Sequence, residues 1–159
     1  MFADAAGCAR YNGSSQAAMA MTVAEPILAE LKQRARAAAQ HAYVPYSGFR
    51  VGAAVLAANG DIHAGANVEN ASFGLAICAE RNALFQAVAR GVRRIDAVAV
   101  YTPTRHATTP CGACRQVLHE FGPEALVVCC TDEAAAERRY ALAELLPGAF
   151  GRADLEGRQ

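Results

Sequence analysis

Apolar residues recur with helical spacing in four stretches of the chain. The first helix is expected to run to about residue 41, and its apolar face is formed by Ile27, Leu31, Ala35, Ala38 and Ala42. Two more amphipathic helices are predicted over 78–89 and 111–121, and a last helical turn over 142–146. Glycine or proline follows each of these three segments, as is typical of helix ends.

Strands are predicted between the helices. Residues 49–58 and 61–68 are rich in Val and Ala, and the Asn-Gly pair between them is typical of a two-residue hairpin turn. Residues 95–101 and 125–130 are apolar runs, interrupted only by Asp96, which indicates strands that are buried on both faces. A short strand over 138–140 follows. This order predicts one α/β layered domain with a mixed sheet, a hairpin first and parallel crossovers after it.

The N-terminal segment lacks any such period. Residues 1–21 contain glycines and serines and no apolar face, so we expect a disordered or non-native extension, followed by a single domain over 22–159. The segment also lacks the roughly 7–15-residue apolar run of a secretion signal, and no stretch reaches the roughly 18 apolar residues of a membrane span. The chain is therefore expected in the cytoplasm, with no membrane partner.

Charge and cysteine content narrow the range of ligands. Fifteen Lys and Arg balance fifteen Asp and Glu, and the longest basic clusters are single arginine pairs, which disfavours nucleic-acid binding. The ligand is expected to be small and not strongly anionic. In the cytoplasm, where disulfides are rare, six cysteines indicate metal binding or catalysis more than a disulfide framework.

Cysteines open two of the predicted helices, in CAER at 78–81 and in PCGACRQ at 110–116. A helix N-terminus lowers the pKa of a thiol, and the thiolate is the form that binds metal. Cys111 and Cys114 lie one helical turn apart, and Cys78 supplies a third sulfur. Three protein ligands with one open position are typical of a catalytic zinc, whereas four close a structural one.

A fourth protein ligand of the zinc is not expected. His106 is the nearest candidate in the sequence and is disfavoured. A Cys-x-Glu segment followed by Pro-Cys-x-x-Cys matches the signature of zinc deaminases, in which the Glu is not a ligand but carries protons. Glu80 occupies that position. For Cys111 and Cys114 alone, a redox pair or a structural zinc site would remain open.

The chain resembles the small homotetrameric cytidine deaminases along nearly all of residues 24–156. The resemblance is carried by five segments, PYSGFRVGAA at 45–54, NVEN at 67–70, CAERNA at 78–83, PCGACRQ at 110–116 and ELLPGAF at 144–150. It implies a three-layer α/β/α cytidine deaminase-like fold with a mixed, mostly parallel five-stranded sheet. It also implies one Zn²⁺ per chain and hydrolytic deamination of cytidine and deoxycytidine to uridine and deoxyuridine, with release of ammonia, in pyrimidine salvage.

The resemblance also implies a role for each matching residue. In that family's pattern Cys78, Cys111 and Cys114 bind zinc, Glu80 shuttles protons, Arg81 lies against the thiolates, Asn67 and Glu69 hold the ribose, Phe49 lines the base pocket, the backbone of Ala79 reads the cytosine edge, and Phe150 enters a neighbouring active site of the homotetramer to stack on the pyrimidine.

Other functions remain open at this point. One is deamination of another cytosine compound, such as blasticidin S, and another is a non-catalytic, zinc-stabilised binding module. A polynucleotide substrate is disfavoured, because the Glu69 carboxylate would accept a hydrogen bond from a free 3′-hydroxyl but repel a 3′-phosphate. The remaining cysteines, Cys8, Cys129 and Cys130, are expected to be inert.

Overall fold

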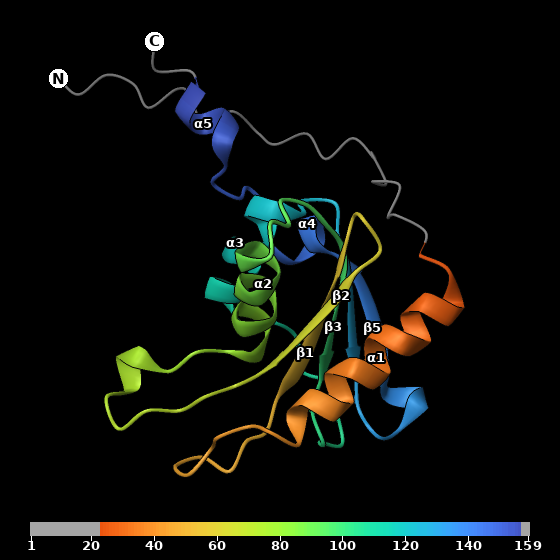
Figure 1. Ribbon diagram of the computed structural model, residues 1–159, viewed down its shortest axis with the longest axis vertical. Helices are drawn as coiled ribbons and strands as arrows, with labels where there is room; N and C mark the ends of the chain where they lie inside the picture. The colour runs from red at the N-terminus through yellow and green to blue at the C-terminus, as the bar shows by residue number, and fades with distance from the viewer. Residues whose placement is uncertain (1–22, 157–159) are drawn as a thin grey trace, which may run out of the picture.

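The computed structural model describes residues 23–156, so the predicted extension at 1–21 lies outside the described residues. Within this range the domain is built from α1 (Glu25–Ala39), β1 (Gly52–Ala57), β2 (Ile62–Ala66), a 3₁₀ turn (Phe73–Leu75), α2 (Ala79–Ala89), β3 (Ile95–Tyr101), α3 (Gly112–Phe121), β4 (Leu126–Cys130), a second 3₁₀ turn (Ala134–Ala136), β5 (Arg138–Ala141), α4 (Leu142–Leu145) and α5 (Arg152–Glu156). Figure 1 shows α1 on one side of the sheet, α2 and α3 on the other, and α5 projecting away.

The five strands form one mixed sheet in the order β2-β1-β3-β4-β5. The expectation of a mostly parallel sheet is wrong, because only β3 and β4 pair in parallel, while β1–β2, β1–β3 and β4–β5 are antiparallel. The helical crossover from β2 to β3 does join strands of one direction, but β1 lies between them and runs the opposite way. The segment between β4 and β5 is too short for a helical crossover, so β5 returns antiparallel.

Helix α1 covers one face of the sheet. Its buried residues are Leu28, Leu31, Ala35 and Ala39, which pack with Ala97 and other side chains of β1, β3 and β4. Leu31, Ala35 and Ala42 of the expected face are buried, but Leu28 and Ala39 take the places of Ile27, which is 41% exposed, and of the half-buried Ala38. The helix begins one residue after Ala24, with Pro26 in its first turn, where a missing backbone N–H costs nothing.

Helices α2, α3 and α4 cover the opposite face. Leu84 and Leu118 are buried there against Val98 and Val100 of β3, whereas the alternate residues Ala97 and Ala99 face α1. Covering both faces explains why β3 and β4 are almost entirely apolar, with Asp96 near the start of β3 as the one charged residue of these two strands. The three-layer α/β/α arrangement expected from the sequence is confirmed (Figure 1).

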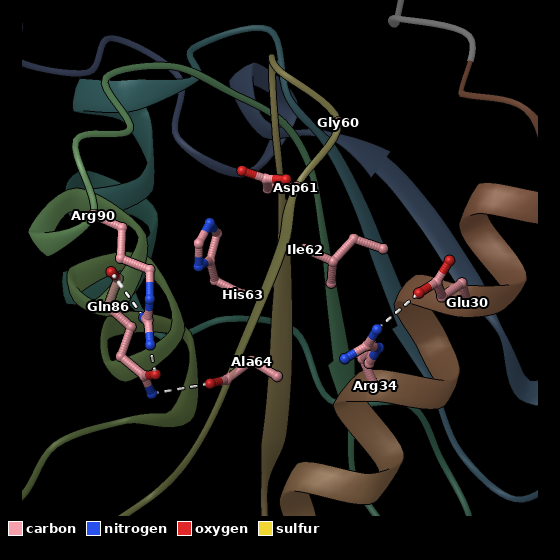
Figure 2. Close-up of a pocket in the computed structure, with 9 residues that line it drawn as sticks. All are labelled: Glu30, Arg34, Gly60, Asp61, Ile62, His63, Ala64, Gln86 and Arg90. Atoms are coloured by element: carbon pink, nitrogen blue, oxygen red, sulfur yellow. Dashed lines mark hydrogen bonds and ion pairs between the residues drawn. The ribbon is translucent and has the colours of Figure 1, made fainter.

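The outer edge of β2 is protected by side chains of α2. Asn82 Nδ2 donates to the Ala66 carbonyl at 2.7 Å, and Gln86 Nε2 donates to the Ala64 carbonyl at 3.0 Å. Figure 2 shows the second of these bonds beside a hollow of about 500 Å³ between α1 and α2. This hollow lies toward the C-terminal end of α2 and is lined by none of the site residues expected from the sequence.

No helix within residues 23–156 is long and apolar enough to cross a membrane. Cys129 and Cys130 are buried in β4, and burial is the main cause that raises the pKa of Cys129 to about 12 and that of Cys130 to about 11. Both thiols therefore stay protonated near neutral pH, and their expected inertness is supported.

Gly52→Ala should destabilise the domain, because α1 approaches β1 at this point without room for a side chain. A Cβ at Gly52 would lie 2.0 Å from the carbonyl oxygen of Ala35 and 2.6 Å from the amide nitrogen of Ala39, and both are backbone atoms. We expect the free energy of unfolding to fall by about 1–3 kcal/mol or more, which lowers Tm by roughly 2–4 °C per kcal/mol.

The matched control is Gly74→Ala, whose added Cβ has no atom within 4 Å among the described residues. Thermal unfolding of the two variants at equal concentration, followed by circular dichroism, measures the difference. Equal Tm values would contradict the close packing of α1 on β1.

Candidate active site

Three cysteines converge where α2 and α3 begin. Cys78 is the N-cap of α2 and Cys111 is the N-cap of α3, while Cys114 lies in the first turn of α3. The backbone carbonyls of the two N-cap cysteines accept the first hydrogen bonds of the helices. Asn82 N donates to the Cys78 carbonyl at 3.1 Å, and Arg115 N donates to the Cys111 carbonyl at 3.0 Å. Because both helices follow strands of the same direction, their positive ends meet at one edge of the sheet.

The three thiols fit a zinc ion. Their sulfur atoms all lie within 4.8 Å of one another, and the Cys78 and Cys111 sulfurs are 3.9 Å apart. Two sulfurs on a tetrahedral zinc, each bonded at about 2.3 Å, lie about 3.8 Å apart. In the part of the chain that the structure describes, this cluster contains no histidine, so His106 is not a fourth member.

Arg81 contributes positive charge to the cluster. Its Nη2 donates to the Cys78 sulfur at 3.4 Å. Hydrogen bonds from Cys114 and then Arg81 lower the pKa of Cys78 to about 5, whereas the neighbouring thiolate and burial raise the pKa of Cys114. Cys78 and Cys114 therefore ionise together more readily when a cation lies between their sulfur atoms, which is the chemistry of a zinc site.

Glu80 is buried beside this cluster. It is the second residue of α2 and only 4% exposed. Burial is the main cause that raises the pKa of its carboxyl group, and the charge of Cys78 raises it further. A carboxyl group in such surroundings can hold a proton nearer neutral pH than an exposed one and can therefore both accept and donate it. Ala79, fully buried before it, keeps a backbone N–H that the helix leaves free.

Asn67 fixes the segment that carries Phe49. Its Oδ1 accepts from Val51 N at 2.8 Å, and its Nδ2 donates to the Phe49 carbonyl at 2.9 Å. A primary amide has a second acceptor lone pair and a second N–H, so Asn67 retains one of each for a ligand. The Phe49 side chain is 42% exposed.

Glu69 is held by the loop that precedes Phe49. Its Oε2 accepts from the backbone N–H groups of Tyr46 at 2.9 Å and Ser47 at 3.2 Å, and its Oε1 accepts from the Ser47 hydroxyl. The Ser47 hydrogen bond is the main cause that lowers the pKa of Glu69, so the carboxylate stays ionised. Glu69, Tyr46 and Ser47 also line a hollow of about 390 Å³, next to Phe73.

Phe150 lies beyond α4 and remains 55% exposed. Its backbone carbonyl accepts from Gln116 Nε2 at 2.7 Å, which ties it to α3. The structure thus brings together the three cysteines, Glu80 and Arg81, and separately couples Asn67 to Phe49. It leaves the Phe150 ring available at the surface of the chain.

Three residues with structural roles here were not singled out from the sequence. Ser47 fixes Glu69, and Arg115 and Gln116 bond backbone carbonyls of the C-terminal segment. All three lie within segments that carry the resemblance, PYSGFRVGAA and PCGACRQ. Their position beside the expected ligand residues is the only sequence signal that could have identified them.

Comparison with known proteins gives concordant matches. The family model described as the cytidine and deoxycytidylate deaminase zinc-binding region matches residues 27–130. A cytidine deaminase of Sporosarcina psychrophila is 46% identical over 131 residues, covering 82% of this chain and 93% of that protein. One of Halalkalibacterium halodurans is 48% identical over 118 residues, covering 74% and 89%.

Solved structures agree with these matches. The crystal structure of cytidine deaminase from Burkholderia pseudomallei superposes with a TM-score of 0.73 at 46% identity, covering 77% of this chain and 98% of that one. The enzyme from Mycobacterium tuberculosis gives a TM-score of 0.68 at 42% identity, with 78% and 97% covered.

Metal content should depend on the clustered cysteines and not on those of β4. We expect about one zinc per chain in the purified protein and a large loss of zinc in Cys111→Ser, because a neutral hydroxyl replaces a thiolate ligand. Cys129→Ala, which removes a buried sulfur outside the cluster, should keep the metal. Inductively coupled plasma mass spectrometry measures both. Full zinc occupancy in Cys111→Ser would show that the site lies elsewhere.

Proposed function

Because the chain belongs to the cytidine and deoxycytidylate deaminase family, we propose that it hydrolyses the exocyclic C–N bond of cytidine and deoxycytidine, giving uridine or deoxyuridine and ammonia. The observation that carries this proposal is a buried carboxyl group, Glu80, beside three thiols that fit a zinc ion. A structural zinc site alone would not need an acid with a raised pKa next to it.

Cys78, Cys111 and Cys114 would hold the zinc ion, which would supply a Lewis acid able to make water a better nucleophile near neutral pH. Three thiolates would leave an excess of negative charge at the site. The Arg81 guanidinium, 3.4 Å from the Cys78 sulfur, and the N-termini of α2 and α3 offset this excess.

Glu80 moves the protons of the reaction. It accepts a proton from the attacking water and passes it to the ring nitrogen next to the reacting carbon. The C4–O bond forms, Glu80 takes the remaining proton from the new C4 hydroxyl and gives it to the amino group, and the C4–N bond breaks so that a C4 carbonyl forms and ammonia leaves. Its buried position keeps this carboxyl group away from bulk water, which suits one group to both transfers.

Substrate recognition is assigned to residues on the neighbouring loops. Asn67 retains one donor and one acceptor for the ribose, and Glu69 is ionised and held in place by Ser47. An ionised carboxylate accepts a hydrogen bond from a free 3′-hydroxyl and repels a 3′-phosphate, which favours a nucleoside over a polynucleotide. Phe49 lines the base pocket, and the backbone of Ala79 binds the polar edge of the cytosine ring.

The active site is completed by a second copy of the chain. We assign Phe150 to a neighbouring site in a homotetramer, because its ring is 55% exposed on a segment that projects beyond α3 and α4 (Figure 1). An aromatic ring of this kind can stack on the face of a pyrimidine base. The reaction fits pyrimidine salvage in the cytoplasm, where thiolate ligands stay reduced.

Glu80→Gln should abolish most turnover and keep the metal. The amide has the shape of the carboxyl group but does not carry protons, so kcat should fall by about 10²–10⁴-fold. The measurement is ammonia release from cytidine, with zinc content determined on the same sample. Glu120→Gln, on the exposed side of α3, is the matched control and should retain activity. A wild-type protein that binds zinc but releases no ammonia would instead be a binding module.

Phe150→Ala should raise KM for cytidine, because stacking of a base on an aromatic ring contributes about 1–3 kcal/mol, equivalent to a roughly 5- to 150-fold change. Phe150→Tyr keeps the ring and should stay close to the parent value. Sedimentation at assay concentration tests the shared site at the same time. A fully active monomer would contradict a site completed by a second subunit.

A further inference from the structure

Arg115 joins three segments of the chain through one guanidinium group. Its Nε donates to the Pro110 carbonyl at 2.7 Å, its Nη2 to the Thr109 hydroxyl at 3.0 Å, and its Nη1 to the Leu145 carbonyl at 2.8 Å. Pro110 and Thr109 immediately precede Cys111, and Leu145 is the last residue of α4. The loop that presents a zinc ligand and the start of the C-terminal segment are thus held by the same side chain.

Gln116, the next residue, holds the same segment further along. Its Nε2 donates to the Phe150 carbonyl at 2.7 Å. One turn later on that face of α3 lies His119, and a Cβ on Gly151 would meet its Nε2 at 3.5 Å, so the backbone after Phe150 rests on this ring. The two anchors at Leu145 and Phe150 bracket the turn at Pro147 and Gly148, where Gly148 adopts a φ of +66°.

Helix geometry explains how neighbouring residues serve different segments. Successive residues of an α-helix point about 100° apart. Cys114 is fully buried and points into the thiol cluster, whereas Arg115 reaches the end of α4 and Gln116 reaches the Phe150 backbone. One turn of α3 therefore faces both the metal site and the segment that carries Phe150.

We propose that Arg115 and Gln116 are positioning residues that clamp the Leu145–Phe150 segment to α3 and thereby set where the Phe150 ring is presented. The proposal rests on the substrate-binding role assigned to Phe150 in the proposed function. Neither residue touches the reacting atoms. Without the clamp, a segment that contains a glycine turn and ends in a half-exposed ring samples many positions, and ordering it on substrate binding costs conformational entropy.

Gln116→Met tests the clamp with little risk to the fold. Methionine has a similar length and helix propensity but no donor. Hydrogen–deuterium exchange of residues 146–151, measured without substrate, should become faster. KM for cytidine should rise by about 2- to 10-fold, the equivalent of one neutral hydrogen bond, while kcat and zinc content should stay close to the parent values. Gln116→Lys restores a donor of similar reach and should recover most of the change.

The matched control is Gln86→Met, which removes the same type of glutamine-to-carbonyl bond at the edge of β2, away from the site (Figure 2). It should change neither KM nor exchange at 146–151. The contribution of Arg115 is tested by Arg115→Lys. This variant keeps the positive charge but cannot make the three hydrogen bonds of the guanidinium group, and hydrogen–deuterium exchange at 146–151 should become faster.

A double-mutant cycle separates the clamp from the role of Phe150. If Gln116 acts through Phe150, the double variant Gln116→Met with Phe150→Ala should have the KM of Phe150→Ala alone. Additive effects on KM, or unchanged exchange at 146–151 in Gln116→Met, would overturn the clamp. Faster exchange in Gln116→Met together with a normal KM in Phe150→Ala would support the clamp and overturn the role proposed for Phe150.

Discussion

The site depends on two helix N-termini that meet at one point of the domain. Two thiolates at the 3.9 Å separation of the Cys78 and Cys111 sulfurs repel each other, and a cation together with the positive ends of α2 and α3 would offset this repulsion. The sheet topology provides this meeting point, because α2 and α3 each follow a strand of the same direction. The burial of Val98, Leu84 and Leu118 between these helices and the sheet then keeps the two N-termini in place.

Two carboxyl groups that we assign to the site have opposite environments, and the difference fits the roles proposed for them. Glu80 is buried at 4% exposure, which raises its pKa, whereas Glu69 is exposed and accepts bonds from Ser47 and Tyr46, which lower its pKa. The first is suited to carry a proton and the second to remain an acceptor. Two groups whose surroundings move their pKa values apart are a general sign of divided acid–base and binding roles.

Local sequence patterns predicted the positions of the helices and strands well, but they predicted the pairing of the strands poorly. The apolar run at 95–101 coincides with β3, and the Asn-Gly pair does lie between β1 and β2. The expected two-residue turn is wrong, however, because Ala57 pairs with Asp61 and leaves a three-residue loop over 58–60. Strand direction could not be obtained in this way, because no local pattern records that β1 lies between β2 and β3. The face of α1 was displaced from Ile27 to Leu28 for a similar reason, since both positions are apolar and only packing on the sheet decides between them.

The same limit applies within the site. The three cysteines and Glu80 could be singled out from the sequence because such residues are rarely grouped, and each pair, Cys78 with Glu80 and Cys111 with Cys114, lies within the first turn of a predicted helix. Arg115 and Gln116 act on the carbonyls of Pro110, Leu145 and Phe150, and a backbone carbonyl has no signature in a sequence. A side chain that bonds the backbone of a distant segment is therefore recognised only once the fold brings the two together. In this chain that contact links the helix of a metal ligand to the aromatic ring proposed to cover a neighbouring substrate.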